Sequence, residues 1–215
     1  MADTAQTAAI LARALEYPYA TPEASYLYLD GGAVQLPPAG PDLAGRTPLI
    51  AYGANSAPAA LARKLAALPG LEMPVMQAEL EGFDVVYSAH VSPYGAVPAT
   101  LAESPGTVVP VFLAHPTPEQ RALLTASEPN YDLVEVAGRA AYRSKHGCLE
   151  LDGSPVALAA VRAAGRTLPE LDEPAILERV RSLVRPAVSL ERFVLDVVEK
   201  GGIRPLRIGA GPAGQ

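Results

Sequence analysis

Short apolar runs, each about the length of a strand, fill the middle of the chain and are separated by glycine, proline and serine. They lie at 47–51, 80–88, 95–101, 108–113 and 134–136. The runs at 108–113 and 157–161 are almost continuously apolar, which favours strands buried on both faces, as in a closed or partly closed barrel. Pro110 inside the first of these predicts a sheet edge or a bulge.

Two helices are predicted between the strands. The first covers 57–68, with Ser56 as its N-cap, Pro58 in its first turn and Pro69-Gly70 at its end. The second begins at Thr117-Pro118-Glu119-Gln120, a capping box with proline at the first helical position.

The segment before residue 47 is predicted to be an N-terminal extension, residues 1–46. Its alanine-rich start, Thr7 to Glu16, suits a helix, and 26–29 suits a short strand. The prolines of 36–41 predict a loop. The extension leads into a central domain at 47–165.

The C-terminal part, 166–215, is predicted to form helices and a tail packed on that domain. Asp172-Glu173-Pro174 opens one helix, and Ser189 caps another that Gly201-Gly202 ends. The tail from 209 is small and polar enough to be disordered. The second helix has an apolar face, expected to pack on the domain or on a second copy of the chain in a homodimer. This face consists of Leu190, Phe193, Val194, Val197 and Val198.

Composition limits the classes of partner. A chain of 215 residues is long enough for one well-filled core. Its net charge of −6 argues against a nucleic-acid partner, which needs a clustered basic face. The single cysteine, Cys148, excludes an internal disulfide and suits a reducing compartment. No apolar run is long enough for a bilayer and no signal-peptide pattern occurs, so no membrane partner and a cytoplasmic location are predicted.

One turn is a candidate binding feature. Tyr52-Gly53-Ala54-Asn55 joins the strand at 47–51 to the helix at 57–68. A glycine there allows a sharp bend, after which successive N–H groups point outward at the start of a helix. Such a nest suits a carboxylate or a developing oxyanion.

The order of motifs resembles the gamma-glutamylcyclotransferase-like superfamily, which includes the AIG2-like proteins. Its members open with a Tyr-Gly-Ser-Asn turn, pass a Gly-Phe strand and a Ser-Pro-Gly turn, and place a catalytic glutamate before a tyrosine. The resemblance covers about residues 47 to 137 of this chain. The matching positions are Tyr52 to Asn55, Gly82-Phe83, Ser104-Pro105-Gly106, and Glu128 with Tyr131. The resemblance implies an α+β fold, a small mixed β-barrel with flanking helices.

The resemblance also implies a reaction. Superfamily members act as acyltransferases that convert a γ-glutamyl amine, amino acid or peptide to 5-oxoproline and the free amine, without a metal or cofactor. Glu128 would carry the proton as the catalytic acid and base. Binding of the γ-glutamyl substrate would fall to the turn and to Tyr131. The substrate-binding residues are thus Tyr52, Gly53, Ala54, Asn55 and Tyr131.

An alternative interpretation is open. Ser127-Glu128-Pro129 also suits a helix stop that leaves Glu128 exposed. Ala54 stands where the superfamily has serine, and Pro129 stands where a glycine is usual. The runner-up function is therefore a catalytically silent relative that serves as a ligand-binding or protein-interaction module. A buried Glu128 beside the turn would favour the enzyme, and a cavity plugged by the N-terminal extension or by Pro129 would favour the module.

Other constellations give no site. The three histidines, His90, His115 and His146, lack metal-ligand spacing. The neighbouring acids Glu103, Glu119 and Glu135 are expected to face solvent.

Overall fold

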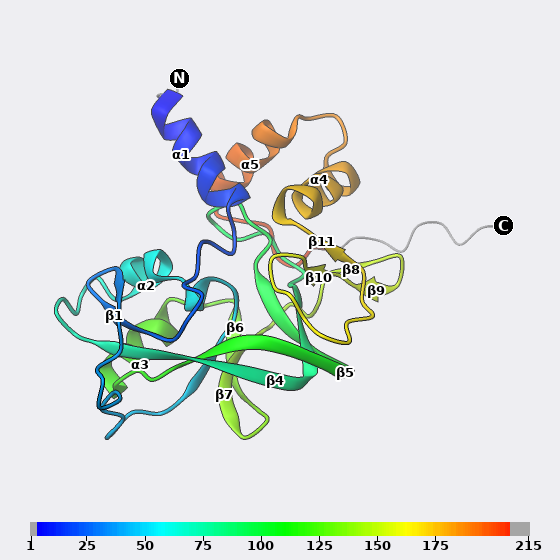
Figure 1. Ribbon diagram of the computed structural model, residues 1–215. Coiled ribbons are helices and arrows are strands. Elements are labelled where there is room, and N and C mark those ends of the chain that lie inside the picture. Colours follow the sequence, from blue (N-terminus) through cyan, green and yellow to red (C-terminus); the bar gives the residue numbers. More distant parts are fainter. Residues whose placement is uncertain (1–3, 207–215) are drawn as a thin grey trace.

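The computed structural model describes residues 4–206, and the tail predicted to be disordered lies outside them. Within this range the chain folds into five α-helices and a large mixed sheet, which confirms the α+β class (Figure 1). The helices are α1 Thr4–Leu15, α2 Pro58–Lys64, α3 Pro118–Ala126, α4 Glu173–Val184 and α5 Leu190–Glu199. A short 3-10 turn, η1 Gly53–Ser56, precedes α2.

Nine strands form the main sheet. In chain order these are β1 Tyr26–Leu29, β2 Gly32–Val34, β3 Leu49–Ala51, β4 Met73–Tyr87, β5 Ala99–Ala114, β6 Tyr131–Val136, β7 Arg139–Ser144, β10 Ala157–Leu158 and β11 Glu170–Leu171. A separate small hairpin pairs β8 Glu150–Leu151 with β9 Ser154–Pro155.

The long antiparallel pair β4 and β5 is the centre of the sheet (Figure 1). The hydrogen-bonded order is β11-β10-β4-β5-β3-β7-β6, and β1 pairs with the start of β4. Strand β3 is antiparallel to β5 and parallel to β7. In residues 4–206 no pairing joins β11 to β6, so the order observed is that of an open path.

Both ends of the chain contribute to this sheet. Strands β1 and β2 come from the N-terminal extension, and β11 comes from the segment after residue 165. A buried ion pair also joins the segment after residue 165 to β4, because Arg166 donates two hydrogen bonds of 2.8 Å to the Asp84 carboxylate.

Strand β5 differs from its prediction in two ways. The prediction that 108–113 is buried on both faces is wrong, because Val109 and Val111 are buried while Pro110 between them is exposed. Strand β3 pairs only with 112–114, so β5 has a free edge at Pro110, as the proline predicted. Ser104-Pro105-Gly106 is not a turn between strands but an irregularity inside β5, where the register with β4 shifts at Gly82.

The second apolar run is shorter than predicted. Strand β10 ends at Leu158, and a turn begins at Ala159. A two-residue strand cannot supply the long, doubly buried strand that the run 157–161 suggested.

Helix ends follow their capping residues with one exception. The capping box at Thr117 and Gln120 is formed, and Asp172 and Ser189 cap α4 and α5. The prediction that Ser56 caps α2 is wrong, because its hydroxyl donates backwards to the carbonyl of Gly53 at 2.8 Å. Helix α2 also ends at Lys64, short of the predicted 68; Pro69 disfavours helical backbone at the residue before it.

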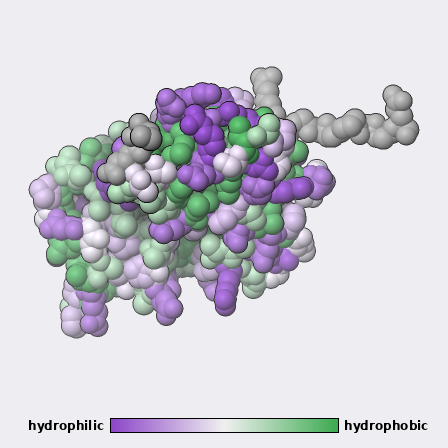
Figure 2. Space-filling model, turned by 90° about the horizontal axis from the view of Figure 1, so that it is seen from above, coloured by the Kyte–Doolittle hydropathy of each residue, from purple (hydrophilic) through white to green (hydrophobic). Residues whose placement is uncertain are grey.

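Helices α1, α4 and α5 gather at one end of the sheet (Figure 1). The apolar face of α5 packs inward as predicted, with Phe193, Val194 and Val197 buried. A Cβ atom on Gly95 would lie 2.9 Å from Val194 and 3.1 Å from Ala14, so this glycine lets a loop approach both helices. Hydrophilic side chains are interspersed with hydrophobic ones over the outer surface of this end (Figure 2).

None of the helices in residues 4–206 has the length and apolar character needed to cross a membrane.

Candidate active site

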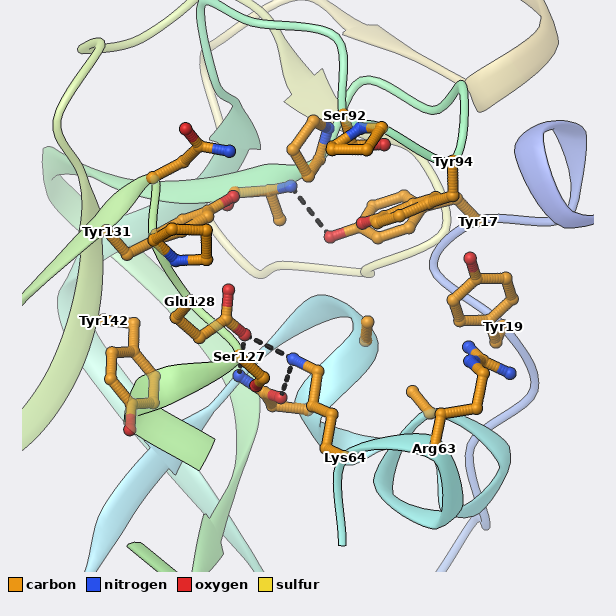
Figure 3. Close-up of a pocket in the computed structure, with 18 of the residues that line it drawn as sticks. Tyr17, Tyr19, Arg63, Lys64, Ser92, Tyr94, Ser127, Glu128, Tyr131 and Tyr142 are labelled. Carbon is orange, nitrogen blue, oxygen red and sulfur yellow. Dashed lines mark hydrogen bonds and ion pairs between the residues drawn. The ribbon is translucent and has the colours of Figure 1, made fainter. Parts of the chain in front are cut away.

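A cavity of about 510 Å³ opens between the sheet, helix α2, the end of α3 and the N-terminal extension (Figure 3). Five of the six residues predicted for the site line it: Tyr52, Ala54, Asn55, Glu128 and Tyr131. Gly53 lies in the same turn but is not among the lining residues. The cavity therefore brings Glu128 together with Tyr52, Ala54 and Asn55 of the turn, but not with Gly53.

Glu128 is held in a tight turn after α3. Its N–H donates to the carbonyl of Thr125 at 3.1 Å, and its own carbonyl accepts the N–H of Tyr131 at 3.1 Å. Pro129 removes one N–H from this turn and disfavours helical backbone at Glu128. The side chain is only 14% exposed, so the interpretation of Glu128 as an exposed helix-stop residue is wrong.

One oxygen of the Glu128 carboxylate is held by two partners. Oε1 accepts hydrogen bonds from Lys64 Nζ and, at 3.0 Å, from Asn55 Nδ2. Lys64 Nζ also donates to Asn55 Oδ1 at 2.7 Å, which closes a triangle of three side chains (Figure 3). The other oxygen, Oε2, has no hydrogen-bond partner within residues 4–206 and turns into the cavity.

The turn places Asn55 for this contact. Gly53 has φ +60°, a conformation that residues with a Cβ rarely adopt, and the backbone then enters the 3-10 turn. The first N–H groups of a helical turn have no partner within it, which leaves those of Gly53 and Ala54 directed outward. The turn therefore supplies the Asn55 side chain to the cavity, and the role of its backbone N–H groups stays a prediction.

Tyrosines form the opposite wall. Tyr17 from the N-terminal extension accepts the N–H of Ala99 at 2.8 Å, and Tyr131 donates to the carbonyl of the same residue at 2.8 Å. Tyr94 stacks on Tyr17 with ring centroids 6.5 Å apart. Burial, with the nearby Glu128 charge, raises the pKa of Tyr52 well above the usual value of 10. These phenols are therefore neutral hydrogen-bonding groups.

His90 also lines the cavity and is neutral. Its Nδ1 lies 2.7 Å from the hydroxyl of Ser88, and its ring centroid is 4.9 Å from that of His146. Burial, followed by the charges of His146 and Arg204, lowers the pKa of His90 to about 3. The neutral imidazole can thus form a hydrogen bond with a ligand but adds no positive charge to the cavity.

Several lining residues were not predicted from the sequence. Among them are Arg13, Tyr17, Tyr19, Arg63, Lys64, His90 and Tyr94. Lys64 is 64 positions from Glu128, and its only sequence signal is its place on the helix that follows the turn. The exposed acids are as expected, since Glu103, Glu119 and Glu135 all face solvent.

In the described residues no cluster of three or more His, Cys, Asp or Glu side chains could hold a metal ion. The chain matches no protein-family model, no curated protein and no solved structure.

Proposed function

We propose that the protein is a gamma-glutamylcyclotransferase-like enzyme that converts a γ-glutamyl compound to 5-oxoproline and a free amine. The observation that carries this proposal is the Glu128 carboxylate, with Oε1 fixed by Lys64 and Asn55 and Oε2 free towards the cavity. A fixed carboxylate with one open oxygen is suited to accept a proton and return it. In this proposal the mixed sheet is a variant of the superfamily's small mixed barrel.

The reaction needs little from the protein besides position and proton transfer. The α-amino nitrogen of the substrate attacks its own γ-carbonyl carbon, so a C–N bond forms within a five-membered ring. Glu128 accepts the proton that the attacking nitrogen loses. The same proton passes to the departing nitrogen as the original amide C–N bond breaks. Holding both ends of the substrate together supplies a large part of the acceleration.

The surrounding groups suit the charges that develop. In this proposal backbone N–H groups of the turn stabilise the oxyanion on the γ-carbonyl oxygen, which is supported by the position of Ala54 in the cavity lining. A cavity of about 510 Å³ has the volume of a small-molecule site. The neutral phenol of Tyr131 and the imidazole of His90 offer further hydrogen bonds.

A second candidate is a catalytically silent ligand-binding module. It is favoured by one observation: Tyr17 from the N-terminal extension reaches the turn, so that a Cβ on Gly53 would lie 2.5 Å from its hydroxyl. The tyrosine narrows the cavity at the place where the backbone donors would meet a substrate.

The deciding experiment is release of 5-oxoproline from a panel of γ-glutamyl amino acids, γ-glutamyl amines and glutathione. Turnover of at least one member, abolished in Glu128→Gln, supports the enzyme. If the folded wild-type protein turns over none of them, the enzyme is rejected and the ligand-binding module takes its place.

A further inference from the structure

The charges around the cavity are unbalanced. Three cationic side chains line it, Arg13, Arg63 and Lys64, against the single carboxylate of Glu128. Lys64 is neutralised by its ion pair with Glu128, and His90 is uncharged. The cavity therefore keeps two positive charges, although the chain as a whole has a net charge of −6. A positive cavity in an acidic protein selects for anionic ligands.

The two unbalanced charges are both guanidinium groups near Tyr19. Arg63 lies over the ring of Tyr19 at 5.1 Å from its centroid, and Figure 3 shows this pair at the side of the cavity away from Glu128. The backbone carbonyl of Arg13 accepts the Tyr19 hydroxyl at 3.1 Å. The charges of both arginines act to lower the pKa of the Tyr19 phenol, against the larger opposing effect of burial. The Arg63 guanidinium is thus stacked on Tyr19, and Arg13 is joined to the same residue through its backbone carbonyl.

Neither arginine forms an ion pair with an acidic side chain within residues 4–206. Within residues 4–206, Arg13 and Arg63 take part in no salt bridge, whereas Arg166, Arg181, Arg185 and Arg192 each have one at 2.8 Å or less. Arg13 instead lies over the ring of Tyr94 at 4.9 Å. A guanidinium stacked on an aromatic face keeps its in-plane N–H donors available for a carboxylate.

Tyr19 adds a sign of strain. Its φ is +74°, in the left-handed region that side chains other than glycine rarely adopt. Such backbone costs free energy and persists where surrounding contacts enforce it, often at ligand sites. The strained residue contacts both arginines, the guanidinium of Arg63 with its ring and the backbone carbonyl of Arg13 with its hydroxyl.

We propose that Arg13, Tyr19 and Arg63 form a carboxylate-binding subsite at the end of the cavity remote from Glu128. The identity of the substrate rests on the proposed function. In that reaction the bound carboxylate belongs to the leaving amino acid. The enzyme should therefore prefer γ-glutamyl amino acids to neutral γ-glutamyl amines. Arg13 and Tyr19 belong to the N-terminal extension, and this extension thereby determines specificity.

Binding can be tested without turnover on the wild-type protein. N-Glutaryl-alanine lacks the α-amino nucleophile and cannot cyclise, and N-glutaryl-alaninamide differs from it only by a neutral amide at the far end. Isothermal titration should show the acid binding at least about tenfold more tightly than the amide, the scale of a hydrogen bond to a charged group. The difference should vanish in Arg13→Gln/Arg63→Gln.

The matched control is Arg162→Gln, which removes the same charge from an exposed residue outside the cavity. It should keep the full preference for the acid. Thermal unfolding of each variant checks that it is folded, and the single variants Arg13→Gln and Arg63→Gln provide the test if the double variant is not. Equal affinity for the two probes, or no binding of either, overturns the subsite.

Failure of the subsite can be told apart from failure of the proposed function. If no γ-glutamyl compound is turned over but the acid still binds through the two arginines, the subsite stands and the cyclotransferase does not. If γ-glutamyl-alanine and γ-glutamyl-alaninamide are turned over with equal kcat/KM, the cyclotransferase stands and the subsite is rejected.

Discussion

The hydroxyl group of Tyr17 occupies the space that a side chain on Gly53 would need. A Cβ atom built on Gly53 would lie 2.5 Å from that hydroxyl and 3.0 Å from the Cβ of Ala99. Residues 36 positions apart in the sequence thus share one packed corner of the cavity, and the glycine is required both by its φ of +60° and by this contact.

Gly53→Ala should therefore destabilise the protein by more than the roughly 1–2 kcal/mol that left-handed backbone costs a residue with a Cβ. Tyr17→Phe removes the obstructing oxygen, so the double variant should recover part of the loss. Chemical denaturation of the two single variants and the double variant measures the coupling between the two positions. Strictly additive effects would show that Tyr17 does not obstruct Gly53.

Glu128→Gln keeps the shape of the side chain but removes its basicity. If Glu128 moves the proton, 5-oxoproline release should fall at least about a hundredfold while substrate affinity changes little. Glu135→Gln, an exposed glutamate on β6, is the matched control and should be as active as the wild type. Full activity of Glu128→Gln would mean that another residue carries the proton.

Ala54→Ser introduces the serine found at the matching position of the turn that this segment resembles. Because the backbone N–H groups would make the contact with the oxyanion, the added hydroxyl should change kcat/KM only modestly, by less than about tenfold. A larger gain would show that a side-chain donor at position 54 contributes to the reaction.

Lys64→Met leaves Glu128 and Asn55 without the shared cation. Both side chains of the ion pair are mostly buried, with 18% and 14% exposed, so the free energy of unfolding should decrease by about 1–3 kcal/mol. Lys200→Met, at an exposed position after α5, should change it by less than about 0.5 kcal/mol. If Lys64 positions Glu128, Lys64→Arg should retain more of the turnover than Lys64→Met does.

Glu173 predicts a pH dependence of stability. Its Oε1 accepts the N–H of Val97 at 2.6 Å, while its buried Oε2 has no partner within residues 4–206. Burial raises the pKa of this carboxyl well above its usual 4.5. The contribution of Glu173 to stability is therefore full below about pH 4.5 and is lost as the pH rises towards the folded-state value.

Glu173→Gln stays neutral and keeps an oxygen for the Val97 N–H. It should thus be more stable than the wild type at about pH 8, with a difference that shrinks as the pH falls towards about 4.5 and stays constant below that value. Denaturant unfolding across this range measures the effect, and the exposed Glu199→Gln is the control. A pH-independent difference would contradict the prediction.

Local patterns in the sequence predicted the elements better than the contacts between them. The capping box at Thr117 and the cap at Ser189 fixed helix starts, because capping depends on residues only three positions apart. The prediction that Ser56 caps α2 was wrong because its hydroxyl donates back to the carbonyl of Gly53. This contact belongs to a 3-10 turn that the helical pattern did not predict.

The candidate site was predictable only in part. The turn at 52–55 and Glu128 could be named from their motifs, and they do share a cavity. The ion pair of Lys64 with Glu128 and the entry of Tyr17 depend on how distant segments pack. Neither a lysine at the end of a helix nor a tyrosine before a proline has a local pattern that indicates these contacts.

The contribution of the N-terminal extension to the cavity has a consequence for folding during synthesis. Helix α1 packs on α5, and the residues that follow α1 line the cavity. A ribosome-bound chain that has not yet released 190–199 cannot complete this packing, although it already contains Glu128 and the turn. Ligand binding would therefore report the docking of α5, and residues 4–19 would reach their final positions only after the much later residues 190–199 had been released.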